Sequence, residues 1–155
     1  MTNAKRKEIA DGLKNETYNL FVENMPLRYA AEMLKAELDK SGNAEDETKF
    51  LEAKKKLEEN WTHHQAKEAE LKKYCALYEV TFSTNVQQGD VTRKVNITKY
   101  YSIPVDYNIT AGQRFNLSDP DFSMLAHEIW NLIYHYEATS FDILQIERIA
   151  PPQIP

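Results

Sequence analysis

Cysteine is almost absent from this chain, which has one such residue, Cys75, among 155. A single cysteine excludes an internal disulfide framework and any zinc site that needs several cysteines. Its expected role is that of a small buried hydrophobic residue where a helix gives way to a strand, because free cysteine is usually buried and inert. The sequence therefore does not indicate thiol chemistry.

Glycine is also scarce, with four residues that form no cluster. Loops that cradle phosphate groups need closely spaced glycines, and the G-x-G-x-x-G and Walker A motifs do not occur. The G-x-S-x-G pattern of serine hydrolases and a paired Cys and His are absent as well. The sequence indicates no cofactor. It leans away from an enzyme, while an unfamiliar type of active site stays open.

Long apolar runs are missing too. No run approaches the roughly 20 residues that span a bilayer, and the opening "MTNAKRKEIADGLK" has no apolar core like that of a signal peptide. We therefore expect a soluble cytoplasmic protein with no membrane segment. Chance in an asparagine-rich chain explains five Asn-x-Ser/Thr sequons, which would mark glycans in a secreted protein; they begin at Asn15, Asn60, Asn96, Asn108 and Asn116.

Positive charge is in short supply, since the net charge is −5. From residue 75 onward, five Lys and Arg stand against nine Asp and Glu. Binding to nucleic acid needs a concentrated basic patch that neutralises phosphates, so the composition argues against a nucleic-acid partner. The lysine-rich segments at 54–56 and 72–73 leave such binding as an alternative, although mixed charges of this kind are typical of a solvated helix face.

Apolar residues make up 42% of the chain, which is enough for a folded core. In the first 74 residues they recur with the period of a helix. A short helix is expected from about Lys5 to Val22, with a stripe formed by Ile9, Leu13, Leu20 and Phe21. Pro26 suits the first turn of a second helix, whose face is formed by Leu27, Ala31, Leu34 and Leu38. Ser41-Gly42-Asn43 is expected to end it.

A longer helix is expected from about Asp46 to Tyr74. One of its faces repeats every seven residues and is widened by neighbours: Phe50, Leu57, His64 and Leu71, with Ala53, Trp61, Tyr74 and Cys75. Two such helices with a short polar loop between them predict an antiparallel, coiled-coil-like hairpin. His64 is expected to be a half-buried core histidine, with a pH-sensitive contact as the functional alternative.

At Cys75 the apolar period changes from helical to two. This alternation predicts strands over 76–86 and 91–103, joined by a turn at 87–90 and closed by Pro104. A further helix follows, with Asp119 as its cap and Pro120 in its first position. The segment "SFDILQIERIA" (140–150) then predicts a third strand, and 151–155 an extended, loose tail.

The predicted fold class is therefore α+β. N-terminal helices, including a long antiparallel helical hairpin, precede a small ββαβ layer with one helix packed on a three-stranded sheet. The expected division is a helical region in 1–74 with its hairpin at about 26–74, the ββαβ module in 75–150, and the tail in 151–155. Open sheet edges and a heptad stripe both favour assembly with a protein partner or into a homo-oligomer.

The helix around "LAHEIWNLIYHYE" (125–137) has two different faces. One sector of about 100° should lie on the sheet, and it contains Phe122, Leu125, Ile129, Leu132, Ile133 and Tyr136. The opposite side carries His127, Asn131 and His135, flanked by Trp130 and Tyr134. Exposed aromatics are enriched in protein contacts. Two readings stay open: this side contacts a partner, or it packs on the N-terminal hairpin.

The start of that segment, His127-Glu128, resembles the His-Glu-x-x-His helix of zinc proteases only in part. The second histidine would have to stand four residues on, where this chain has Asn131. His135 is eight residues on, about 12 Å away by helix rise, so the two histidines cannot share one metal ion. The sequence thus predicts no metal site.

Three hypotheses of function follow. The first is a non-enzymatic protein–protein interaction module: an oligomeric adaptor, inhibitor or structural accessory protein of bacterial or phage origin. The second is a small enzyme with an unrecognised site of histidines and carboxylates near His127 and His135. The third is a nucleic-acid binder that uses the lysine-rich side of the long helix.

Overall fold

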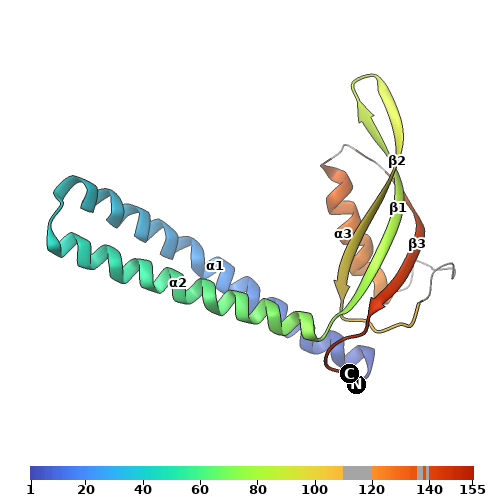
Figure 1. Cartoon of the computed structure of the whole chain (residues 1–155), viewed down its shortest axis with the longest axis horizontal. Helices are drawn as coiled ribbons and strands as arrows, with labels where there is room; N and C mark the ends of the chain where they lie inside the picture. Colours follow the sequence, from blue (N-terminus) through green and yellow to red (C-terminus); the bar gives the residue numbers. More distant parts are fainter. Residues whose placement is uncertain (110–119, 136–137, 139) are drawn as a thin grey trace. The chain divides into compact units, whose positions relative to one another are not determined.

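The computed structural model describes residues 1–109, 120–135, 138 and 140–155. Two long helices come first, followed by a three-stranded sheet with one further helix (Figure 1), which confirms the α+β class. The elements are α1 (Asn3–Ser41), α2 (Ala44–Lys73), β1 (Ala76–Gln88), β2 (Val91–Ile103), the 3-10 turn η1 (Pro120–Phe122), α3 (Ser123–Tyr134) and β3 (Phe141–Ala150). They form two compact units, residues 8–71 and residues 1–7 with 72–155.

The first unit is a helical hairpin whose seam has strict heptad spacing. Every buried or half-buried residue of this seam follows the last by three or four positions, as in a coiled coil. On α1 these are Ala10, Leu13, Thr17, Leu20, Asn24, Leu27, Ala31, Leu34 and Leu38, and on α2 they are Phe50, Ala53, Leu57, Asn60, His64, Lys67 and Leu71. The predicted hairpin is thus present, and His64, expected to be half-buried, is buried in its seam.

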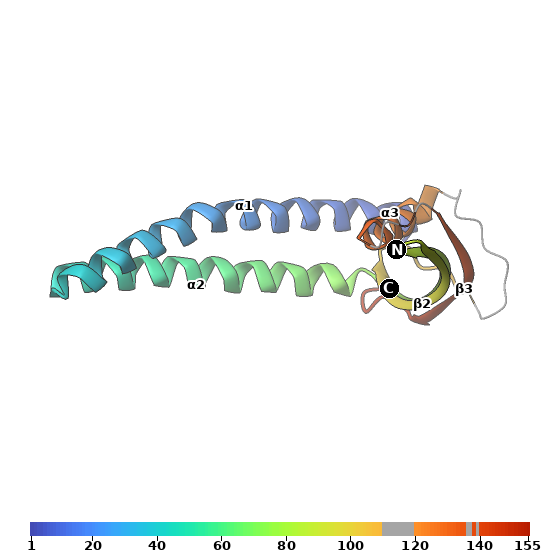
Figure 2. The same cartoon turned by 90° about the horizontal axis from the view of Figure 1, so that it is seen from above.

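The expected start of a new helix at Pro26 is wrong, because Pro26 lies inside one continuous α1. A proline within a helix removes one hydrogen bond and bends the chain, and Figure 2 shows α1 bending toward α2 in its second half. The spacing of the seam runs unbroken through Leu20, Asn24, Leu27 and Ala31. Packing along this seam on both sides of Pro26 therefore outweighs the local cost of the proline.

The expectation that Trp61 widens the seam is also wrong, since its side chain is exposed and the seam position belongs to Asn60. Asn60 follows Leu57 by three residues and so keeps the heptad spacing. The Asn24 amide donates a hydrogen bond to Asn60 Oδ1 at 2.9 Å. The Asn60 amide in turn donates to the Leu20 carbonyl at 3.1 Å. A polar pair of this kind in an apolar seam sets the register of the two helices.

The loop between the two helices contains a typical C-terminal cap for α1 and a typical N-terminal cap for α2. Gly42 has a positive φ of 64° and donates its N–H to the Leu38 carbonyl at 2.8 Å, which ends α1. The side-chain oxygen of Asn43 accepts the N–H of Asp46 at 2.8 Å and caps α2. The predicted helix end at Ser41-Gly42-Asn43 is confirmed.

The second unit is built on a sheet with the strand order β2-β1-β3, antiparallel throughout. The predicted hairpin of β1 and β2 is confirmed, with Gly89 at a φ of 62° in its turn. Alternate residues of the central strand are buried, namely Ala76, Tyr78, Val80 and Phe82. The predicted apolar side of α3 joins this core through Phe122, Leu125, Ile129 and Ile133. α3 lies between β2 and β3 in the sequence and packs on residues of the central strand β1.

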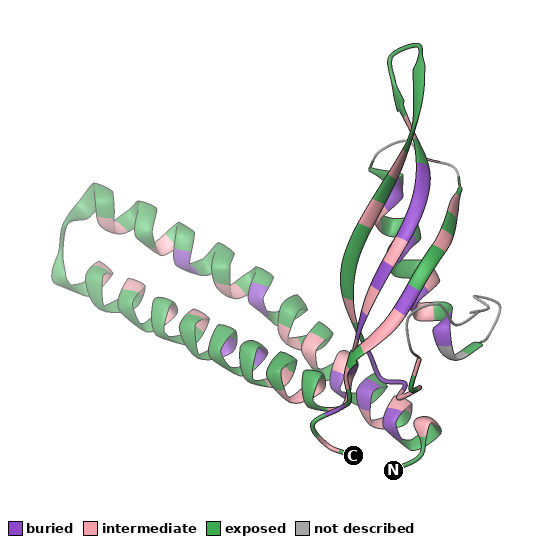
Figure 3. Cartoon of the chain, turned by 45° about the vertical axis from the view of Figure 1, so that its right-hand side comes forward, coloured by how far each residue is buried: buried purple, intermediate pink, exposed green. Residues whose placement is uncertain are grey.

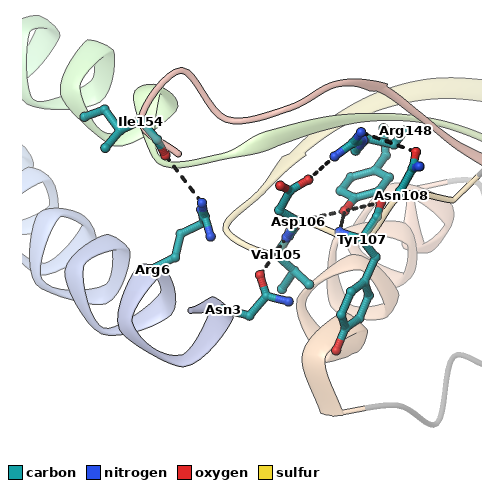
Figure 4. Close-up of polar contacts among 9 residues, drawn as sticks. Asn3, Arg6, Val105, Asp106, Tyr107, Asn108, Arg148 and Ile154 are labelled. Carbon is teal, nitrogen blue, oxygen red and sulfur yellow. Dashed lines mark hydrogen bonds and ion pairs between the residues drawn. The ribbon is translucent and has the colours of Figure 1, made fainter. Parts of the chain in front are cut away.

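Both chain ends are tied into this unit (Figure 4). Asn3 Oδ1 accepts the backbone N–H of Asp106 at 2.9 Å, and Arg6 donates to the Ile154 carbonyl at 3.4 Å. The Ile154 N–H donates to the Lys73 carbonyl at 3.0 Å. The expectation of a loose tail at 151–155 is therefore wrong. The Ile154 N–H bonds the Lys73 carbonyl, the Ile154 carbonyl accepts from the Arg6 side chain, and Pro152 is buried, so the tail is held in place.

Tyr78 provides the polar anchor of the core. Its side chain is fully buried, and its hydroxyl donates to the Val105 carbonyl at 2.5 Å and accepts the Tyr107 N–H at 3.0 Å. The hydroxyl thus satisfies backbone groups of the segment that leaves β2. Burial raises the pKa of Tyr78, because the charged phenolate is poorly solvated there.

We expect Tyr78→Phe to lower the free energy of unfolding by about 1–3 kcal/mol, because it leaves a buried carbonyl and N–H unpaired. The control is Tyr100→Phe, whose exposed hydroxyl donates to Glu79 at 2.8 Å; it should cost less than about 0.5 kcal/mol. Urea denaturation measures both. Equal losses in the two variants would contradict the anchoring role.

The raised pKa of Tyr78 also predicts a pH dependence. As the pH passes about 10, the unfolded chain loses this proton before the folded chain does. The unfolded state then binds fewer protons, so the stability falls as the pH rises further. Tyr78→Phe should show a smaller loss of stability between pH 9 and pH 11 than the unchanged chain, as measured by denaturation at each pH.

For the hairpin, we expect Asn24→Leu to cost about 1–3 kcal/mol, because Asn60 Oδ1 loses its donor inside the seam. Adding Asn60→Leu should recover part of that loss, since no buried polar atom of the pair is then left unpaired. Thermal unfolding followed by helical circular dichroism measures Asn24→Leu, Asn60→Leu and the double variant. A double variant that loses as much as the sum of the single losses would show that the pair is not coupled.

Candidate functional site

The five residues proposed from the sequence lie together on the side of α3 away from the core. His127, Asn131 and His135 are exposed, Trp130 is 46% exposed, and Tyr134 is 80% exposed. They stand on successive turns of one helix, so they form a surface strip and not a cleft. The Trp130 ring packs edge-on against Phe141 at 5.0 Å between centroids. Trp130 is thus partly a packing residue, whereas the Tyr134 ring lies largely in solvent and meets the neighbouring His135 ring edge-on at 6.2 Å between centroids.

Metal binding finds no support in this strip. Within the described ranges, no group of three or more His, Cys, Asp and Glu side chains could hold a metal ion. The start of the helix also differs from the expectation. Pro120 begins the 3-10 turn, and α3 starts at Ser123 with Phe122 at its N-cap and no side-chain cap. The expected cap Asp119, like Tyr136, lies outside the described residues.

A larger exposed surface lies on α1, on the side that does not face the seam. Six large apolar side chains there are between 44% and 66% exposed: Tyr18, Phe21, Val22, Met25, Tyr29 and Met33. At 100° per residue they fall within a sector of about 120°, centred roughly 140° around the helix from the seam. We call these six residues the outer stripe. Figure 3 shows the exposed outer sides of both hairpin helices.

The sequence interpretation missed the outer stripe for an identifiable reason. The stripe crosses Pro26, where one helix was expected to end and another to begin. If the chain is divided into two helices at Pro26, Tyr18 and Val22 belong to one helix and Tyr29 and Met33 to another, so the four residues do not form a common face. The signal was nevertheless present, because all six positions recur at spacings of three or four or their multiples once the helix is continuous.

The outer side of α2 provides the contrast. Its charged residues form pairs one turn apart, with Lys54 Nζ 4.0 Å from Glu58 and Lys55 Nζ 4.0 Å from Glu59. Exposed pairs of this kind add little stability. They do offset the positive charge of the lysine cluster, which weakens the case for a phosphate-binding surface. The outer side of α2 resembles an ordinary solvated face, and the outer side of α1 does not.

A groove of about 520 Å³ lies along the hairpin, lined by Asn24, Arg28, Leu57, Glu58, Trp61 and Thr62. The Trp61 ring stacks on the buried His64 ring at 5.2 Å between centroids, with 7° between the planes. His64 Nε2 lies 3.9 Å from Glu68. The groove is lined by apolar and hydrogen-bonding side chains together with one arginine and one glutamate.

Close to this groove, Lys67 lies in the seam and reaches Glu16 at 2.9 Å. The hydrogen bond to Glu16 raises the pKa of Lys67. Three successive seam positions of α2, namely Asn60, His64 and Lys67, are therefore polar. The seam is apolar on either side of them, at Leu57 and Leu71.

No family model matches this chain, and neither the curated proteins nor the solved structures searched contain a match. In the part of the chain that the structure describes, no helix combines the length and apolar character needed to cross a membrane.

On the surface strip of α3, Trp130 packs against the protein and Tyr134 lies largely in solvent, so their replacement should affect stability differently. Trp130→Ala should lower the free energy of unfolding by about 1–3 kcal/mol, because it removes the contact with Phe141. Tyr134→Ala should stay within about 0.5 kcal/mol, because its ring is largely in solvent. Thermal denaturation measures both variants. Similar losses would mean that Tyr134 also packs against the protein.

Proposed function

We propose that this chain is a non-enzymatic protein-interaction module that binds a protein partner through the outer stripe of α1. The observation that carries this proposal is the stripe itself, six large apolar side chains on one exposed helix face. Aromatic residues and methionine are enriched at protein interfaces, and five of the six are of these types. A helix that presents such a face to a groove or to another helix is a common mode of recognition.

The size of the stripe supports the same proposal. At about 200 Å² per large aromatic side chain, and less for Met and Val, the exposed fractions leave on the order of 600 Å² of apolar surface. Monomeric proteins seldom expose a contiguous apolar patch larger than roughly 300–600 Å². The stripe stands at the top of this range on a single helix. Covering it with a partner would remove this surface from water.

The strip on α3 is proposed as a second, smaller contact. Tyr134 offers a ring that is almost wholly in solvent, and His127, Asn131 and His135 surround it with hydrogen-bonding groups. The Trp130 ring packs edge-on against Phe141 and so fixes the strip to the sheet. An exposed aromatic residue within a polar rim suits a protein contact better than a catalytic centre.

Site-specific photo-crosslinking in cells tests the proposal. A benzophenone amino acid in place of Tyr29 should give a covalent adduct with one defined protein, identified by mass spectrometry. The matched control carries the same group in place of Lys55, which is exposed on the outer side of α2, and should give no such adduct. If the adducts are absent at both positions, or identical at both, the outer stripe is not a binding surface.

A further inference from the structure

We infer that the partner of the outer stripe is a second copy of this chain, paired antiparallel through α1. This inference rests on the proposed function and adds the identity and orientation of the partner. The two-fold axis of the pair passes beside Met25 and Pro26. A symmetric pair of this kind uses the same surface on both copies, so each residue must face a complementary one across the axis.

The outer stripe meets this requirement. Tyr18 and Met33 lie equally far along the sequence from the Met25–Pro26 midpoint, on opposite sides of it. The antiparallel pair therefore places Tyr18 of each copy near Met33 of the other. Val22 and Tyr29 are related in the same way. The two tyrosine rings of the stripe are thus each opposed by a flexible or small apolar side chain, with which they pack more easily than with a second ring.

One pair of charges beyond the stripe, Asp11 and Lys40, favours the same orientation. Lys7 and Lys14 also lie in the sector, at the same end as Asp11, and are outside this pair. Asp11 and Lys40 fall in the sector of the stripe, beyond its two ends and equally far from the axis. In an antiparallel pair, Asp11 of each copy faces Lys40 of the other. A parallel pair would instead set Asp11 against Asp11 and Lys40 against Lys40, and such like-charge contacts oppose association.

The buried area is also adequate for a dimer of two copies. Two stripes of on the order of 600 Å² together reach the lower end of the roughly 1,200–2,000 Å² that specific interfaces bury. The solvated outer side of α2, with its pairs of lysine and glutamate, is left out of this interface. In the pair, the two α1 helices are central and the two α2 helices lie outside them.

Disulfide trapping in the full chain tests the orientation, on a background with Cys75→Ser. Met25→Cys should form a disulfide-linked dimer with itself under mild oxidation, because the two copies meet at the axis. Tyr18→Cys should not, since its two copies lie about 22 Å apart by helix rise, far beyond disulfide reach. A mixture of Tyr18→Cys and Met33→Cys chains should form the mixed dimer. Self-linking of Tyr18→Cys would overturn the antiparallel arrangement.

Light scattering and sedimentation of the full chain test the dimer itself. The unchanged chain should be a dimer at micromolar concentration, and Met25→Glu should raise the dimer dissociation constant roughly 100-fold. The matched control is Leu51→Glu, which places the same charge on an exposed leucine of α2 and should leave the dimer intact. Circular dichroism checks that both variants keep their helices.

The results separate this inference from the proposed function. A monomer at all concentrations overturns the dimer, as does a dimer that Met25→Glu does not weaken. If Tyr29 then crosslinks to a different protein, the proposed function stands and only the identity of the partner is wrong. If Tyr29 crosslinks to nothing and the chain is a monomer, both proposals are wrong.

Discussion

The helical hairpin depends on one constraint, which is that α1 has a single partner helix within its unit. The seam with α2 takes every third or fourth residue of α1 from Ala10 to Leu38 and leaves the rest of the helix surface uncovered. A helix that is apolar on one side satisfies this arrangement fully. The α1 helix is apolar on two sides, so closing the seam necessarily turns Tyr18, Met25 and Tyr29 outward. The proposed function rests on that geometry.

In both units, a buried polar side chain forms hydrogen bonds with other buried polar groups. In the hairpin, the Asn24 amide donates to Asn60 Oδ1, and the Asn60 amide donates to the Leu20 carbonyl. In the sheet unit, the hydroxyl of Tyr78 satisfies the backbone at Val105 and Tyr107. In both cases the polar group is worth little as a net contribution to stability, but leaving its partner unpaired costs more. The asparagine pair sets the register of the two helices, and the Tyr78 hydroxyl sets the position of the segment that leaves β2.

Most of the fold could be predicted from periodicity. The change from helical spacing to alternation at Cys75 marked the start of β1, and the alternation placed the turn near Gly89. The apolar side of α3 was correct at Leu125, Ile129 and Ile133. The errors occurred where a local rule met tertiary packing. Proline usually starts or ends a helix, yet Pro26 does neither, and tryptophan is usually more buried than asparagine, yet Asn60 is in the seam and Trp61 is not.

The sequence by itself determined which segments are helix and strand and which side of each is apolar, because those properties follow from the spacing of side chains within one element. Only the tertiary structure decided which apolar side of α1 is covered. That choice depends on α2, whose heptad positions match one face of α1 in register and whose outer side is charged. The same choice joined Tyr18 to Met33 across Pro26 as one exposed stripe, and this relation exists only when the helix is continuous.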